Sequence, residues 1–115
     1  METRIVKNKI TRNELNVLAH EQYIDIIKAV VDVEKEIMGV GGELHVDIQS
    51  LLIEKENSHG KDTWGINLYL DKIGDDFIEF DSMINLKPNL GNRTRDIGNS
   101  EIKEKIRNIV NKLVQ

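Results

Sequence analysis

The amino-acid sequence predicts an α+β fold in which helices cover one face of an antiparallel sheet. Three segments alternate apolar and polar residues as half-buried strands do, at positions 43–47, 64–69 and 78–85. A fourth segment, 102–113, repeats apolar residues at helical spacing. We expect the elements in the order β-αα-βββ-α, packed as two layers. Because 115 residues suffice for a single core, we expect one globular domain over residues 1–115.

Composition excludes several classes of protein. Hydrophobic residues make up 39% and charged residues 31%, which is typical of a globular protein. No apolar run approaches the ~20 residues that span a bilayer, and the N-terminus lacks the pattern of a signal peptide. The expected compartment is therefore cytoplasmic, without membrane contact. The absence of cysteine excludes disulfides, thiolate nucleophiles and cysteine-based zinc sites.

Charge is distributed unevenly along the chain. Residues 1–85 contain nine Lys and Arg against 17 Asp and Glu, a net charge of −8, whereas residues 86–115 contain seven against three, a net charge of +4. The overall charge of −4 argues against generic nucleic-acid binding, which depends on neutralising phosphates. The basic tail could still contact an anion, or the acidic surface of a second copy.

The first part of the chain predicts a short strand and two helices. Residues 4–10 are partly apolar and β-branched, as strands are, and Thr11 with Glu14 matches a capping box that starts a helix. Residues 21–38 fit either structure, since β-branched residues favour a strand and periodicity favours a helix. We prefer the helix, ended by Gly41 and Gly42. Its apolar stripe comprises Tyr23, Ile24, Ile27, Val30, Val31, Ile37 and Met38.

The second part predicts a meander of strands and a final helix. Pro88 would end the last strand, and Ser100 would cap the helix, whose stripe begins at Ile102. The expected elements are a strand at 43–47 that resumes at 51–55, a loop at 56–62, strands at 63–70 and 77–87 joined by a turn, and an irregular loop at 89–98.

Five segments of the chain carry a family resemblance: KAVVDVE (28–34), GGELH (41–45), WGIN (64–67), INLKP (84–88) and GNR (91–93). In this order they resemble a small prokaryotic family of uncharacterised proteins, domain of unknown function family 5674. The resemblance spans nearly the whole chain, and it implies no activity.

One candidate site centres on a histidine between two carboxylates. On a strand, Glu43, His45 and Asp47 would share a face about 6.5–7 Å apart, close enough to share a divalent metal or a proton. Glu79 and Asp81 would share that face on a neighbouring strand, where paired carboxylates could serve as acid and base. The candidate catalytic residues are thus His45, Glu43, Glu79 and Asp81. The alternative is an ordinary solvated acidic face, which we favour, so no cofactor is expected.

A second candidate site combines amides and arginines. Asn67 and Asn85 interrupt strand patterns, in which asparagine is depleted, so they either bind a ligand or support neighbouring backbone. Arg93 and Arg95, in the loop before the last helix, could form forked hydrogen bonds with a phosphate or carboxylate. The alternative is that both arginines pair with the acidic sheet face.

We therefore predict a non-catalytic ligand-binding or protein-interaction domain, with a small anion or a second copy of the chain as candidate partners. The polar sheet face and the arginine loop would form its binding surface. One alternative is a metal-assisted or acid–base hydrolase centred on His45, Glu43, Asp47 and Glu79. Another is nucleotide or RNA binding through Arg93 and Arg95, against which the aromatic content of 4% argues.

Overall fold

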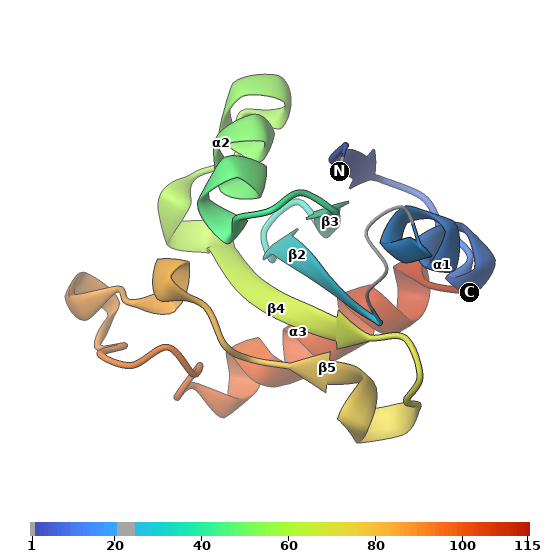
Figure 1. Ribbon diagram of the computed structural model, residues 1–115. Helices are drawn as coiled ribbons and strands as arrows, with labels where there is room; N and C mark the ends of the chain where they lie inside the picture. The colour runs from blue at the N-terminus through green and yellow to red at the C-terminus, as the bar shows by residue number, and fades with distance from the viewer. Residues whose placement is uncertain (1, 21–24) are drawn as a thin grey trace.

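The computed structural model describes residues 2–20 and 25–115 and contains a five-stranded, wholly antiparallel sheet with three α-helices (Figure 1). The strand order is β1-β3-β2-β4-β5. The predicted α+β class is confirmed. The elements are β1 (Arg4–Val6), α1 (Arg12–His20), β2 (Ile26–Asp32), β3 (Ile37–Val40), α2 (His45–Glu56), β4 (Thr63–Tyr69), β5 (Ile78–Glu79) and α3 (Ser100–Leu113).

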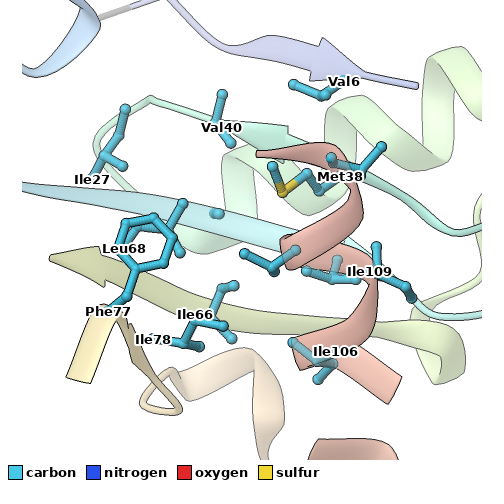
Figure 2. Packing of buried hydrophobic residues seen from close by; sticks show 14 of the residues in the cluster. Val6, Ile27, Met38, Val40, Ile66, Leu68, Phe77, Ile78, Ile106 and Ile109 are labelled. Carbon is cyan, nitrogen blue, oxygen red and sulfur yellow. The ribbon is translucent and has the colours of Figure 1, made fainter. Parts of the chain in front are cut away.

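Helices cover both faces of the sheet, which corrects the expectation that they would cover one. Leu15 of α1 and Ile106 of α3 belong to the main core with one set of strand residues, as Figure 2 shows for α3. On the opposite face, Ile48 and Leu52 of α2 pack with Val30 of β2. Successive residues of a strand point to opposite faces, so β2 buries apolar residues on both sides.

The predicted helix over residues 21–38 is wrong, because β2 and β3 form a β-hairpin there. A strand buried on both faces is a continuous apolar run, and such a run fits a helical stripe as well as a strand. The side chain of Asp32 stabilises the connecting turn by accepting hydrogen bonds from the backbone N–H groups of Glu34 and Lys35, each at 2.9 Å. The part of the prediction at residues 21–24 lies outside the described residues.

The predicted strand at 43–47, resuming at 51–55, is also wrong, because these residues lie just before and within α2. Gly41 and Gly42, with φ angles of 88° and 98°, redirect the chain from β3 into this helix. The helical period was obscured because Val46 and Ile53 are apolar yet exposed.

Other elements agree closely with the sequence. The capping box is present: Glu14 N–H donates to Thr11 Oγ1 at 3.0 Å, and Thr11 N–H donates to Glu14 Oε1 at 3.2 Å. The strand at 63–70 and the last helix are confirmed as β4 and α3, although Asn99 rather than Ser100 is the N-cap.

Three differences are local. The strand predicted at 4–10 ends at Val6, and the strand predicted at 77–87 ends at Glu79. After β5 the chain forms a 3₁₀ turn at Met83–Asn85, and the loop at 89–98 begins inside a second such turn, Pro88–Leu90. Among the described helices, none is long and apolar enough to cross a membrane.

Candidate functional site

A cleft of about 490 Å³ opens on the α2 face of the sheet, between the start of α2, strands β2 and β4, and the segments around residues 81–84 and 95. Its polar lining brings together residues that are far apart in the sequence. These are Lys28, His45, Asn67, Asp81, Ser82 and Arg95. Four of them, all except Lys28 and Ser82, were candidates from the sequence.

His45 is the first residue of α2 and lies half-buried in the cleft wall. Its Nε2 lies 2.8 Å from the carbonyl oxygen of Ile66. A carbonyl only accepts, so Nε2 carries the proton and donates it. Burial lowers the pKa of His45 below its usual 6.5; the positive charges of Lys28 and Arg95 act in the same direction, against the Ile66 hydrogen bond and Asp81. The imidazole is therefore neutral at pH 7.

Arg95 and Asp81 form an ion pair at the cleft, with Arg95 Nε 2.6 Å from Asp81 Oδ1. The sequence left open that both arginines of the loop pair with acidic residues of the sheet. The structure shows such a pair for Arg95. The Arg95 carbonyl accepts from Ser82 N–H at 3.1 Å and from Asn85 Nδ2 at 3.0 Å, which ties the arginine loop to the segment after β5. Because Asp81 bonds the Nε side, the terminal nitrogens of the guanidinium are left to other acceptors.

Three strands contribute a row of polar side chains beside this pair. Lys28 of β2 is directly opposite Asn67 of β4, which in turn is opposite Glu79 of β5. Asn67 Nδ2 donates to Glu79 Oε1 at 2.8 Å and to the Asp81 carbonyl at 3.3 Å. These two acceptors fix the orientation of the Asn67 amide, and its Oδ1 is buried without a hydrogen-bond partner among the described residues.

The α2 N-terminus adds a partial positive charge to the cleft. Leu44 is the N-cap, and it has no side-chain acceptor for the first N–H groups of the helix. These groups, at His45 and Val46, belong to residues that line the cleft. The start of a twelve-residue helix carries a positive dipole end, which favours an anion there.

Asn85 supports the site from behind without lining the cleft. Its Oδ1 accepts from Gly65 N–H at 2.8 Å, and its Nδ2 donates to the carbonyls of Gly65 and Arg95, both at 3.0 Å. All three bonds are to backbone, which is the supporting alternative considered for this residue.

The remaining candidates lie apart from the cleft. Glu43 and Asp47 are exposed and do not line it, and because His45 is helical the three no longer share one face. The strand geometry that the alternative metal site required is therefore wrong. In the described part of the chain, no group of three His, Asp or Glu side chains is placed to hold a metal ion. Glu79 lines a neighbouring hollow with Tyr69, and Arg93 is exposed outside the cleft.

Sequence reasoning missed Lys28 and the apolar rim formed by Leu44, Val46 and Met83. Lys28 did carry a signal, since it is the lone charge inside the apolar run IIKAVV at 26–31. A charge within a buried strand usually faces a polar site or a partner.

The fold and the cleft define an α+β domain with a small polar cleft on one face of an antiparallel sheet. Residues 4–113 match the model of the family described as "Protein of unknown function (DUF5674)". The chain therefore belongs to that family, and the resemblance noted in the sequence is confirmed. No curated protein and no solved structure matches the chain.

Proposed function

We propose that the protein is a non-catalytic ligand-binding domain whose cleft takes a small monovalent anion with an apolar part. The observation that carries the proposal is the convergence of Lys28, Arg95 and the uncapped start of α2 on one cleft. Donors of this kind favour carboxylate or phosphate oxygens.

The charge of the lining favours one negative charge on the ligand. Lys28 and Arg95 contribute two positive charges, Asp81 contributes one negative charge, and His45 is neutral, which leaves a net charge of +1. A dianion would leave one charge uncompensated beside the Asp81 carboxylate, and an unpaired charge in a partly dry cleft is unfavourable. A carboxylate matches the lining better than a doubly charged phosphate does.

The rim favours an apolar group on the same ligand. Leu44, Val46 and Met83 have 56%, 48% and 62% of their surface exposed, and all three line the cleft. Small-molecule sites commonly combine such apolar walls with a few polar groups. An aryl or branched alkyl carboxylate fits both parts of the lining.

The test is titration of the protein with phenylacetate, followed by backbone amide shifts and by calorimetry. We expect shifts at residues of the cleft, and an affinity that falls about 10-fold or more in Arg95→Gln, because a hydrogen bond to a charged group contributes roughly 1.5–3 kcal/mol. Arg93→Gln is the matched control, since it removes the same charge from an exposed residue outside the cleft.

Two results would contradict the proposal. One is the absence of saturable phenylacetate binding to the wild type. The other is an equal loss of affinity in Arg93→Gln and Arg95→Gln, which would indicate attraction to the basic loop as a whole, as in the nucleotide alternative.

A further inference from the structure

His45, which lines the cleft, carries a ring nitrogen that no described residue uses as a hydrogen-bond acceptor. Nε2 is committed to the Ile66 carbonyl at 2.8 Å, so in the neutral ring Nδ1 is the unprotonated nitrogen. No described residue donates to Nδ1, and it is not among the buried side-chain atoms that lack a partner. It is therefore open to a ligand.

We propose that this acceptor makes the cleft selective for anions that carry their own hydroxyl donor, the simplest being 2-hydroxy carboxylates. The inference rests on the function proposed above and specifies its ligand class. Arg95 and Lys28 would bind the carboxylate, while Nδ1 of His45 would accept the hydroxyl proton. A hydroxyl on the carbon next to the carboxylate keeps both interactions within one small group.

The surroundings of His45 keep this nitrogen an acceptor near pH 7. The charged groups that act on the ring are Lys28 from β2, and Asp81 and Arg95 from the loop segments, and two of these three are positive. Together with burial they lower the pKa of His45, so a second ring proton is not taken up at neutral pH. A simple carboxylate would bring only further acceptors to Nδ1 and would leave it without a bond.

The experiment compares two probes that differ in one hydroxyl, mandelate and phenylacetate. We expect the wild type to bind mandelate about 2–10-fold more tightly, the value of one neutral hydrogen bond of roughly 0.5–1.5 kcal/mol. In His45→Leu, whose side chain has no acceptor, the ratio should fall to about one. In His45→Gln the amide can donate to the Ile66 carbonyl and keeps its own oxygen as an acceptor, so a preference for mandelate should remain. His59→Gln, an exposed histidine outside the cleft, should leave the ratio unchanged.

A second measurement requires no ligand. Long-range ¹⁵N–¹H spectra of the imidazole should show His45 as the tautomer protonated at Nε2, and protonation at Nδ1 instead would overturn the inference. Equal binding of the two acids by the wild type would overturn it as well, while leaving the proposed function standing. Binding of neither acid would overturn both.

Discussion

Buried asparagines connect the parts of the site to one another. The Asn85 side chain accepts from Gly65 N–H and donates to the carbonyls of Gly65 and Arg95. It thus bonds both backbone groups of Gly65, as a residue of a neighbouring strand would. Asn92 donates to the carbonyls of Asn85 and Asp96 and accepts from Gly98 N–H. An amide side chain carries one acceptor and two donors, so it can replace missing backbone partners where the sheet ends. The backbone of Arg95 is thus held by Asn85, a side chain that does not line the cleft.

Replacing Asn85 with alanine should destabilise the fold strongly. The change removes the Asn85 partner from the N–H and the carbonyl of Gly65 and leaves the Arg95 carbonyl with the Ser82 N–H alone, which should lower the free energy of unfolding by about 2–4 kcal/mol. Urea denaturation measures the change. Asn89→Ala is the matched control, because Asn89 is exposed and makes no side-chain hydrogen bond in the described structure. Similar stability in both variants would contradict the supporting role.

His45 should make stability depend on pH. Its pKa in the folded protein lies below 6.5, so the unfolded chain binds the proton more readily. The stabilising contribution is complete above about pH 6.5 and is lost as the pH falls toward the folded pKa. Urea denaturation between pH 7.5 and 5 should show a steeper loss in wild type than in His45→Gln. Parallel curves for the two proteins would contradict this.

At the scale of elements, the sequence predicted those whose large apolar side chains lie on one side only. In β4 both faces are buried, but the large apolar residues Trp64, Ile66 and Leu68 share one face. β4 and α3 each contact the main core, and their periods were read correctly. β2 is buried on both faces, so its run of apolar residues carried no period that distinguishes strand from helix. In α2, only Ile48 and Leu52 are buried, while Val46 and Ile53 are exposed, so the apolar pattern did not mark the buried stripe.

The wrong secondary structure expected for α2 also limited how much of the site could be predicted from the sequence. His45, Asn67, Asp81 and Arg95 were identified by residue type, because polar groups in apolar or loop settings stand out in a sequence. Their partners were not predictable, since the position of His45 depends on α2 being a helix, and that of Arg95 depends on hydrogen bonds across the loop. The strand geometry assumed for the alternative metal site was wrong for this reason.

The contact of α2 with the sheet depends on the absence of a side chain at Gly39. A Cβ there would lie 2.6 Å from Ile48 Cγ2. Gly39→Ala should therefore cost about 1–3 kcal/mol through overpacking, and Ile48→Ala about 2–5 kcal/mol through a cavity. In the Ile48→Ala background the glycine substitution should cost much less, because the clashing atom is gone.

A double-mutant cycle by urea denaturation measures this coupling. Gly60→Ala is the control, since a Cβ at Gly60 would meet nothing within 4 Å. Additive effects of the two substitutions would show that α2 does not rest on Gly39 in the way described.

For the whole molecule, the two faces of the sheet are closed to different degrees. One face is sealed by α1 and α3, whose apolar residues form the larger core. The other face is covered by α2, which supplies two of the four buried residues of a smaller cluster. Ile84, in the turn at Met83–Asn85, packs against this cluster. A helix of twelve residues is only about 18 Å long, so it cannot cover a five-stranded sheet. The cleft lies where α2 begins and its cover ends.

Hydrogen bonds between the N-terminal and C-terminal parts of the chain also constrain the order in which the protein can fold during synthesis. Ile10 N–H donates to the Leu113 carbonyl at 2.7 Å, and Gln115 N–H donates to the Ile10 carbonyl at 2.9 Å. α3, which runs to Leu113, supplies four buried residues to the core. On a ribosome, Ile10 and the start of α1 therefore lack these hydrogen-bond partners until residues 113–115 emerge, and the apolar sheet face lacks α3 meanwhile. A nascent chain stalled before residue 100 should be a substrate for chaperones.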